Sequence, residues 1–440
     1  MLGTRNPEVL VVGAGPVGLL AALKLANRGV RVGIVDREWR PGAHSYALAL
    51  HARSLALLDE LGLRDRVLEA AYPVRTVAVY DDAGERRAEM RLPGGDEAGG
   101  AGCVAVMRQD ALEKLLADAL KRAGVKVAWN HEVVRLVPED DRVGVTINEL
   151  AKDTVGYAVA HTNWVVARSS DFNVPWVVGA DGHRSSVRRM LSVGFAESGP
   201  AQHFAVFEFK TTADLGDEMR LVLGEQTADV LWPLPDGYCR FSFELPDFSA
   251  SQAISEKGSD PLGLRGLTPF RIGTKSRVPV EIGTARFPVL SEESLRTLLG
   301  ERAPWFEGEV EEIRWRIVVR FERRLAEAFG RGRMWLAGDA GHITGPAGMQ
   351  SMNVGLREAD ELAGILATVL RDRAPEEGVR EYNKKRLEEW QFLLGIEGGL
   401  VPKPGADPWV AQNAGRLLPC IPAAGDDLEA LAAQIGLERQ

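Results

Sequence analysis

The feature that most constrains the fold of this 440-residue chain is a glycine pattern near its start. Gly13, Gly15 and Gly18 directly follow an apolar run over residues 9–12, and Asp36 closes the next apolar run. Between them, apolar residues recur every three or four positions, which is typical of an amphipathic helix. The pattern predicts a strand, a tight loop, a helix and a second strand, which together form a unit of a parallel sheet.

Each glycine of this unit has a structural role that a larger residue could not fill. Gly13 permits the sharp turn after the strand, and Gly15 lets the backbone approach a pyrophosphate. Gly18 allows the helix to pack closely on the strand. The N-terminus of that helix favours a negatively charged group, and a carboxylate at Asp36 can accept hydrogen bonds from a ribose while repelling a 2′-phosphate. The unit therefore predicts a bound dinucleotide, either FAD or NAD.

Composition and charge exclude several classes of partner. The net charge of −9 does not attract nucleic acid or an anionic membrane through the overall field. No apolar run approaches the roughly 20 residues of a membrane helix, and the N-terminus lacks the pattern of a signal peptide. Cys103, Cys239 and Cys420 are far apart, so we expect free thiols, no metal site and a cytoplasmic protein.

A second architecture follows the first along the chain. Residues 204–245 alternate between apolar and polar with a period of two, which predicts an antiparallel sheet with one covered face. Residues 76–92 alternate around an Asp-Ala-Gly turn and predict a hairpin. The tail holds two segments with helical periodicity, at 376–395 and 426–437.

Two later motifs distinguish between FAD and NAD. The segment "VVGADGHRSSVRRML" begins at residue 177, and "GDAGHITGPAGMQSMN" begins at Gly338. Asp339 directly follows an apolar run, where a carboxylate can accept a hydrogen bond from a ribityl chain. The helix expected from about Met352 can direct its dipole at a ring that develops negative charge. A flavin has both the ribityl chain and such a ring, and these motifs therefore favour FAD.

The three motifs, in this order, resemble those of flavoprotein aromatic hydroxylases of the para-hydroxybenzoate hydroxylase type over about residues 9–370. Asp181, Gly182 and Arg184 resemble the Asp-Gly signature of that family, and Gly338, Asp339 and His342 resemble its Gly-Asp signature.

The resemblance implies a fold class and a division into domains. The fold is α/β: a Rossmann-like FAD-binding domain with a parallel sheet and ββα layers, an interleaved antiparallel-sheet substrate domain, and C-terminal helices. The FAD-binding domain would comprise residues 1–75, 103–190 and 280–370, and the substrate domain residues 76–102 and 191–279. Residues 371–440 would form the helical segment.

FAD as the resident cofactor, with NADH or NADPH as a transient reductant, is implied by the same resemblance. The residues expected to hold the cofactor come from the three motifs and the segments beside them. They are Gly13, Gly15, Pro16, Val17, Gly18, Asp36, Arg37, Arg53, Gln109, Asp181, Gly182, Gly338, Asp339, Pro346, Gly348, Met349, Ser351, Met352 and Asn353.

The chain departs from the family pattern at several positions. Tyr46 stands where an arginine is expected to reach the pyrophosphate, so Arg40 or Arg53 would replace it. Met349 and Ser351 stand where glycines are usual, and a positive φ at either would cost about 1 kcal/mol or more. Glu358 and Glu361 replace an aspartate and an asparagine.

The activity implied is a monooxygenase that hydroxylates an aromatic or polyketide-like compound with NAD(P)H and dioxygen through a flavin hydroperoxide. No catalytic protein residue is then required, although the backbone at Pro346 could accept a hydrogen bond from a phenol. The candidate substrate-lining residues are His203, Phe207, Trp232 and Phe243. Few basic residues lie on this sheet, which favours an apolar or polycyclic phenol over a small anionic benzoate.

Other interpretations stay open at this stage. A flavin-dependent halogenase or reductase could use the same scaffold, but a halogenase would carry a Trp-x-Trp-x-Ile-Pro-like segment and the chain has only "EIRWRIVV". The departures at Tyr46, Met349 and Ser351 also permit a flavin-binding protein without catalysis. His342 could be purely structural, and Arg184 and Arg188 could form a solvated face. We expect a monomer or a homodimer.

Overall fold

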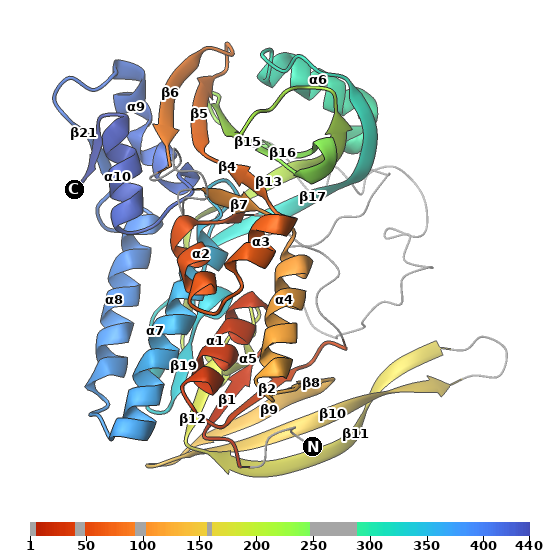
Figure 1. The fold of residues 1–440 in the computed structure, drawn as a ribbon, viewed down its shortest axis with the longest axis vertical. Helices are drawn as coiled ribbons and strands as arrows, with labels where there is room; N and C mark the ends of the chain where they lie inside the picture. The colour runs from red at the N-terminus through yellow and green to blue at the C-terminus, as the bar shows by residue number, and fades with distance from the viewer. Residues whose placement is uncertain (1–5, 40–48, 93–102, 156–160, 247–287) are drawn as a thin grey trace.

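The structure is a computed structural model that describes residues 6–39, 49–92, 103–155, 161–246 and 288–440. Figure 1 shows a large antiparallel sheet at the top, a parallel sheet with its helices below it, and the C-terminal helices along one side. Tyr46 and Arg40, two residues that enter the prediction for the pyrophosphate, lie outside the described residues.

The lower sheet has six strands in the order β18-β19-β12-β1-β2-β8. Its neighbouring strands are parallel except for the β18/β19 pair. The strands are β1 (Val9–Val12), β2 (Val32–Asp36), β8 (Val127–Trp129), β12 (Trp176–Gly179), β18 (Gly330–Arg331) and β19 (Met334–Leu336). All four side chains of β1 are buried, as expected of a strand that is covered on both faces. The strands before the three motifs, β1, β12 and β19, are neighbours, so the motifs meet at one edge of this sheet.

Helix α1 (Pro16–Asn27) follows the glycine loop and contacts α4 (Gln109–Arg122) and α7 (Gln350–Asp372). Pro16 occupies the first turn of α1, where its missing N–H costs nothing. Gly29 follows the helix with φ +74°, as expected of a glycine that ends a helix. The predicted strand–loop–helix–strand unit is therefore confirmed. The short helices α2 (Ala52–Asp59), α3 (Arg64–Ala70) and α5 (Ser186–Met190) complete this part.

The upper sheet has eight strands in the order β20-β17-β13-β16-β15-β14-β5-β6. The strands are β5 (Thr76–Asp81), β6 (Arg86–Arg91), β13 (Phe195–Thr211), β14 (Glu218–Leu223), β15 (Ala228–Pro233), β16 (Tyr238–Glu244), β17 (Val310–Ala326) and β20 (His342–Ile343). Neighbours are antiparallel except β14 and β5, which run parallel. The predicted hairpin over 76–92 and the antiparallel sheet over 204–245 are both present, and they join in one sheet.

Strand β17 corrects one expectation. Its residues fall in the range 280–370 that was assigned to the FAD-binding domain, but β17 pairs with β13 along most of its length. The reason is that pairing with a distant strand leaves no local signal in the sequence of β17. The remainder of the division into domains stays a prediction.

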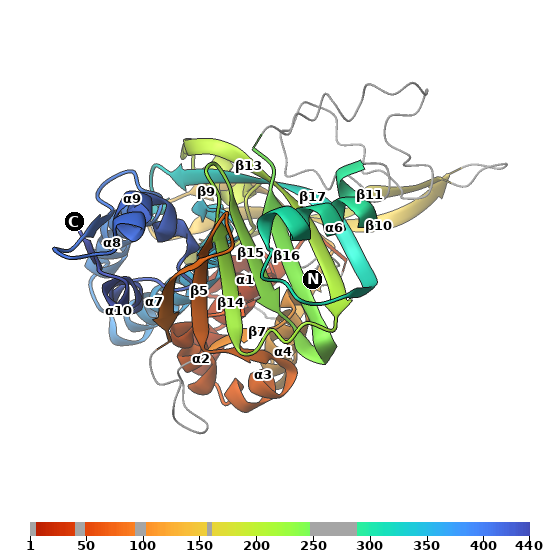
Figure 2. The same ribbon diagram turned by 90° about the horizontal axis from the view of Figure 1, so that it is seen from above.

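The two faces of the upper sheet have different neighbours. Helix α6 (Glu292–Arg302), after the 3-10 turn η2 (Pro288–Leu290), covers the outer face, where Phe207, Phe241 and Phe243 pack against its leucines. Figure 2, viewed from above, shows α6 over this face. The inner face, which carries Trp232, belongs to the same apolar core as α1 and α7. This inner face therefore meets the body of the molecule.

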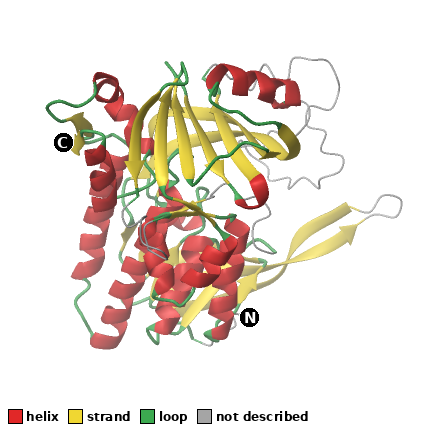
Figure 3. Cartoon of the chain, turned by 45° about the horizontal axis from the view of Figure 1, so that its top comes forward, coloured by secondary structure: helices red, strands yellow, loops and turns green. Residues whose placement is uncertain are grey.

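Three smaller sheets complete the fold, as the cartoon in Figure 3 shows. Their strands are β9 (His131–Pro138), β10 (Val143–Val155) and β11 (His161–Val174), then β3 (Ala49–Leu50), β4 (Tyr72–Val74) and β7 (Val104–Val106), and finally β21 (Leu400–Pro402) and β22 (Leu437–Arg439). The ends of β10 and β11 project from the body in Figure 1. This hairpin was not predicted.

The C-terminal segment contains the two predicted helices, α8 (Glu377–Leu393) and α10 (Asp426–Gln434). Between them lie α9 (Pro408–Leu417) and the 3-10 turn η4 (Leu418–Cys420). The segment is tied to the upper sheet, because the Gln434 side chain exchanges two hydrogen bonds with the backbone of Arg91. Cys103, Cys239 and Cys420 are buried free thiols. Within the described ranges, no helix is long and apolar enough to cross a membrane.

Candidate flavin site

The glycine loop has the geometry that its sequence predicts. Gly13 has φ +104°, and a Cβ there would lie 2.2 Å from the carbonyl oxygen of Ala180. A Cβ on Gly18 would lie 2.0 Å from the carbonyl oxygen of Gly13. A Cβ on Gly15 would meet nothing within 4 Å. Gly13 and Gly18 are thus required by close packing, whereas Gly15 faces open space at the N-terminus of α1.

Asp36 lies at the end of β2, beside this loop. Its Oδ2 accepts a hydrogen bond from the Ala14 backbone N–H at 2.6 Å, and its Oδ1 accepts one from Glu38 at 2.8 Å. Burial raises the pKa of Asp36. The carboxylate is therefore fixed next to the loop, in the position expected for contact with a ribose.

The middle motif leaves one carboxylate oxygen without a partner. Oδ2 of Asp181 accepts hydrogen bonds from the backbone and hydroxyl of Ser186 and from the backbone of Val187. Oδ1 of Asp181 is buried and has no hydrogen-bond partner among the described residues. A buried acceptor without a donor is costly, so this atom fits a hydroxyl or N–H supplied by a bound molecule.

Arg188 of the middle motif is buried and forms no solvated face. Its Nη1 donates to the carbonyl of Ala340 at 2.7 Å, and its Nη2 donates to that of His183 at 2.8 Å. Its guanidinium also lies 3.7 Å from the ring centroid of Phe195. Arg188 thus links the middle motif to the third motif.

The third motif is held by Glu358, one of the departures from the family pattern. The 3-10 turn η3 (Gly338–Ala340) contains Gly338, whose backbone N–H donates to Glu358 at 2.8 Å. His342 and Trp390 are also hydrogen-bonded to this carboxylate, each at 2.9 Å, and their rings stack 3.7 Å apart. Burial alone would raise the pKa of Glu358, but His342 and the other partners lower it overall. His342 therefore has a structural role, with a side-chain partner.

Asp339 follows Gly338 in the same turn and lines the cavity described below. Burial raises the pKa of this carboxyl. The turn thus places one half-buried carboxyl group of the motif at the cavity, and Glu358 fixes the backbone of the turn.

The loop before α7 shows which conformations Met349 and Ser351 adopt in place of the two usual glycines. Met349 has φ +51° and ψ +33°, so it occupies the left-handed region that was expected to strain a non-glycine residue. Ser351 lies inside α7 and is not strained; its Oγ accepts a hydrogen bond from the Thr344 N–H at 3.1 Å. Of the two departures, only Met349 carries the expected conformational cost.

His51 and Ser54, which the sequence did not single out, help to hold this loop. Nε2 of His51 lies 2.9 Å from the carbonyl oxygen of Gly348, and burial lowers the pKa of His51 to about 3. Oδ1 of Asn353 accepts hydrogen bonds from the His51 backbone and from the hydroxyl of Ser54. His51 lies in a segment with helical periodicity, so nothing in its local pattern distinguishes it from a residue of an ordinary amphipathic helix.

Gly348 itself packs against the C-terminal segment. Its N–H donates to the carbonyl of Pro419 at 3.1 Å, and a Cβ would lie 2.7 Å from the carbonyl oxygens of Pro419 and Ile421. Gly348 was expected to help hold the cofactor; in the structure it packs against the C-terminal segment and does not line the cavity described below.

A cavity of about 330 Å³ lies where the three motifs meet the upper sheet. Its lining combines the glycine loop, α4, the middle and third motifs, and β17. The residues are Gly15, Pro16, Val17, Gln109, Ala180, Gly182, His183, Val319, Arg320, Phe321, Glu322, Ala337, Asp339, Ile343, Thr344, Gly345, Pro346, Met349, Ser351 and Met352. Ten of the predicted cofactor residues line it: Gly15, Pro16, Val17, Gln109, Gly182, Asp339, Pro346, Met349, Ser351 and Met352.

The remaining predicted residues shape the surroundings or point elsewhere. Gly13, Gly18 and Gly338 pack within the motifs, and Asn353 donates hydrogen bonds to the carbonyls of Ala49 and Met349. Arg37 is half exposed and pairs with Glu38.

Arg53 corrects an expectation. Its Nε and Nη2 donate to Asp427 and Asp426 at 3.0 and 2.9 Å, so its guanidinium is held at the start of α10. The sequence could not reveal this pairing, because the two carboxylates come from the far end of the chain.

Two of the candidate substrate residues lie on the wrong face. Phe207 and Phe243 pack under α6, in the outer apolar cluster. Val319 and Phe321, which line the cavity, belong to the inner cluster with Phe204. Alternate residues of a strand point to opposite faces, so a choice that is wrong by one residue places a side chain on the other side of the sheet.

The other two candidates remain on or near the inner side. Trp232 is fully buried in the main core, and its Nε1 has no hydrogen-bond partner among the described residues. His203 lies opposite the cavity-lining Arg320 in the β13/β17 ladder. Burial lowers the pKa of His203, and the positive charge of Arg320 lowers it further. Cavity residues that the sequence did not select include His183, whose pKa burial lowers to about 4.

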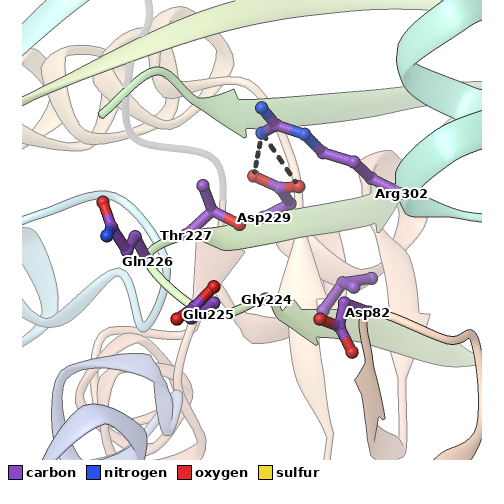
Figure 4. Close-up of a pocket in the computed structure, with 8 residues that line it drawn as sticks. Asp82, Gly224, Glu225, Gln226, Thr227, Asp229 and Arg302 are labelled. Atoms are coloured by element: carbon purple, nitrogen blue, oxygen red, sulfur yellow. Dashed lines mark hydrogen bonds and ion pairs between the residues drawn. The ribbon is translucent and has the colours of Figure 1, made fainter. Parts of the chain in front are cut away.

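A second cavity, of about 280 Å³, lies at the β14/β15 turn and α6. Figure 4 shows Asp229 pointing at Arg302, whose Nη1 lies 3.4 Å from both carboxylate oxygens. Burial raises the pKa of Asp229 to about 7. None of the three sequence motifs contributes to this cavity, so the candidate site is the cavity between the motifs and β17.

Fold and site together define a class: a dinucleotide-binding flavoprotein with a separate antiparallel sheet over the binding edge. The family model described as the FAD binding domain matches residues 6–393. The chain belongs to this family. The resemblance that the motifs suggested and the expectation of FAD as cofactor are thereby confirmed.

Relatives with curated names agree with this assignment. The chain is 30% identical over 391 residues to the 6-methylpretetramide 4-monooxygenase of Streptomyces rimosus. The aligned region covers 88% of this chain and 60% of that protein. It is 26% identical to the pentachlorophenol 4-monooxygenase of Sphingobium chlorophenolicum, over 89% of this chain and 64% of that one. The chain therefore spans about 60% of the length of these relatives.

Solved structures confirm the predicted fold class. The p-nitrophenol 4-monooxygenase of Pseudomonas putida superposes with a TM-score of 0.66 at 21% identity, over 96% of this chain and 92% of that one. The anhydrotetracycline hydroxylase of Streptomyces rimosus superposes with a TM-score of 0.62 at 23% identity, over 89% of this chain and 68% of that one.

Proposed function

We propose that this protein is an FAD-dependent monooxygenase that hydroxylates an aromatic or polyketide-like compound with NAD(P)H and dioxygen. The observation that carries the proposal is the cavity at which three motifs from distant parts of the chain meet the inner face of the antiparallel sheet. The names of the relatives, which act on a pretetramide and on pentachlorophenol, support the substrate class.

The residues present fit FAD. The open space before Gly15 and the N-terminus of α1 suit a pyrophosphate, and Asp36 suits the adenosine ribose. The unpartnered Oδ1 of Asp181 and the cavity-lining carboxyl of Asp339 suit hydroxyl donors. Bound FAD supplies the redox chemistry, in which NAD(P)H provides electrons and dioxygen provides the oxygen atom.

The chain's own contribution is to orient and to exclude water. Met349, Ser351 and Met352 bring the N-terminal end of α7 to the cavity wall, where the helix dipole favours a negatively charged ring. Val319 and Phe321 provide an apolar wall, and an apolar wall keeps water from the reacting atoms. The backbone at Pro346 lines the same cavity and can accept a hydrogen bond from a phenolic hydroxyl.

NADH or NADPH acts as a visiting reductant in this proposal. No second strand–glycine–helix fingerprint follows in the sequence, so a nicotinamide would bind for one transfer and leave. A cytoplasmic location and a monomeric or homodimeric state stay predictions.

The experiment is an absorption spectrum of the purified protein, followed by NADH and NADPH oxidation in the presence of a panel of phenols. We expect flavin bands near one equivalent, bleaching by one nicotinamide, and an oxygenated product from at least one phenol. Asp339→Asn should retain the fold and lose flavin, because Asn carries no formal charge and accepts fewer hydrogen bonds. Flavin that is bound and reduced without any oxygenated product would refute the monooxygenase proposal.

A further inference from the structure

The inner face of the antiparallel sheet carries a buried carboxylate surrounded by arginines. Glu208 of β13 is fully buried. Its Oε1 accepts hydrogen bonds from Arg108 and, at 3.2 Å, from Arg314. Its Oε2 accepts hydrogen bonds from Arg240 at 2.8 Å and from the indole of Trp315 at 3.1 Å. The donors come from the start of α4, from β16 and from β17, so only the folded chain brings them together.

This arginine cluster, defined as Arg108, Arg240 and Arg314 around Glu208, lies on the inner face of the sheet whose strand β17 also lines the flavin cavity. Trp315 and the cavity-lining Val319 belong to one apolar cluster on the inner face of β17. Four residues of a strand separate them by about 13 Å. The cluster also adjoins the cavity through α4, since Arg108 directly precedes Gln109, which lines it.

The cluster has more positive than negative charge. Burial alone would raise the pKa of Glu208, but Arg240 and Arg108 lower it overall, so this group is an anion. Among the described residues, Glu208 is the only carboxylate within 4.0 Å of Arg108 or Arg314. One carboxylate cannot neutralise both of these arginines, whatever else balances Arg240. The cluster can therefore take up a further anion.

Arg108 and Arg314 are accessible and oriented. Their side chains are 38% and 36% exposed, whereas Arg240 is almost fully buried. The register between β13 and β17 shifts after Glu208, which inserts Arg314 as an extra residue and changes its direction. Its guanidinium lies 3.6 Å from the ring centroid of Tyr238, which restricts the orientation of its donors.

We propose that Arg108 and Arg314, held in place by Glu208, bind the carboxylate of the aromatic substrate. The proposal rests on the proposed function and narrows its substrate class to an extended aromatic acid. The planar guanidinium is suited to a carboxylate, because its N–H groups match the two oxygens. Trp315, which pairs with Glu208 across β13 and β17, lies about 13 Å along β17 from the cavity-lining Val319. An acid that reaches from the Val319 wall to the arginines is therefore longer than one ring. This revises the expectation of a neutral phenol and retains that of a polycyclic compound.

The test measures binding to the flavin-loaded protein in the absence of NAD(P)H, by changes in the flavin spectrum and in tryptophan fluorescence. Three probes are compared: a hydroxybiphenyl carboxylate, the neutral phenylphenol of the same length, and the shorter hydroxybenzoate. We expect the long acid to bind about tenfold more tightly than either of the others, as one additional charge-assisted pair provides. Equal affinity for the long acid and the neutral phenol would overturn the proposal, and so would a failure of the acid to bind.

Variants separate recognition from structure. Arg108→Gln and Arg314→Gln should each weaken the long acid about tenfold and leave the neutral phenol within about twofold. Their melting temperatures should change little, because Glu208 keeps other arginines. Arg108→Lys should recover part of the affinity, since it restores the charge without the planar fork. Equal losses for acid and phenol would mean that the cluster is only structural.

Arg316→Gln is the matched control. Arg316 lies on the same strand but opposite Phe207, whose side chain points to the outer face. The Arg316→Gln variant should change neither the affinity for the long acid nor the affinity for the neutral phenol. The binding test measures no turnover, so the two proposals can fail separately. A protein that binds the long acid but forms no oxygenated product would refute only the monooxygenase proposal. An active monooxygenase that does not prefer the long acid would refute only the carboxylate-binding proposal.

Discussion

The parallel and the antiparallel sheet build their parts of the site in different ways. At the edge of the parallel sheet the decisive atoms belong to the backbone: Gly13 and Gly18 are confined by carbonyl oxygens, and Gly15 leaves space. On the antiparallel sheet the decisive atoms belong to side chains, such as Glu208 and the arginines around it. The first arrangement depends on residue spacing, and the second depends on which face each residue occupies.

This difference explains which expectations were reliable. A glycine required by a close approach has no substitute, so its spacing is visible in the sequence. A side chain on a strand can be moved to the other face by a register change of one residue. Phe207 and Phe243 were assigned to the wrong face for this reason, whereas the glycine loop was assigned correctly.

The largest effect should come from breaking the backbone contact on the parallel side. In Gly13→Ala, the new Cβ would meet the Ala180 carbonyl at 2.2 Å while φ is +104°. Strain and overpacking together should reduce the free energy of unfolding by about 5 kcal/mol. The measurement is urea unfolding of the flavin-free protein.

Gly15→Ala is the control for that variant. Its Cβ would meet nothing within 4 Å, so the flavin-free protein should lose less than about 1 kcal/mol. Its FAD content should fall, because the methyl group fills the space in front of the helix. If Gly13→Ala and Gly15→Ala reduce the free energy of unfolding equally, close packing at Gly13 does not explain the loss.

The next effect concerns the antiparallel side. Glu208→Gln removes the buried carboxylate to which Arg108 and Arg314 donate, and the loss of this charge from a buried ion pair should cost about 3 kcal/mol or more. Glu197→Gln is the comparison, since Glu197 is 57% exposed and pairs with Arg324; it should cost less than about 1 kcal/mol. Chemical unfolding of both variants measures the difference, and similar losses would show that burial of the Glu208 charge is unimportant.

A pH effect should come from His51, which contacts Gly348 in the loop before α7. Its pKa falls from 6.5 to about 3 in the folded protein, because burial opposes its charge. Below pH 6.5 the unfolded chain binds a proton that the folded protein does not bind, so stability decreases as the pH falls from 6.5 toward 3. His51→Gln should reduce this slope by up to about 1.4 kcal/mol per pH unit, as measured by unfolding at several pH values. An unchanged dependence of stability on pH in this variant would contradict the lowered pKa of His51.

The smallest effect should come from Met349. Both Met349→Gly and Met349→Ala remove the long side chain, so their difference isolates the backbone. With φ at +51°, the glycine variant should be more stable than the alanine variant by about 1 kcal/mol. Thermal unfolding measures this difference; if the alanine variant is equally stable, the left-handed conformation is not strained.

The sequence by itself determined the three motifs, the strand–loop–helix–strand unit, the hairpin over 76–92, the antiparallel region and the two C-terminal helices. These depend on local spacing and periodicity, which restrict the backbone within a few residues of each position. Together with the family resemblance that the motifs carry, they identified ten residues that line one cavity.

Only the tertiary structure decided which side chains meet. It joined β17 to β13, paired Arg53 with Asp426 and Asp427, placed His51 against Gly348 and collected three arginines at Glu208. The physical reason is that these contacts join residues far apart along the chain, and their energies depend on burial and register that no local pattern encodes.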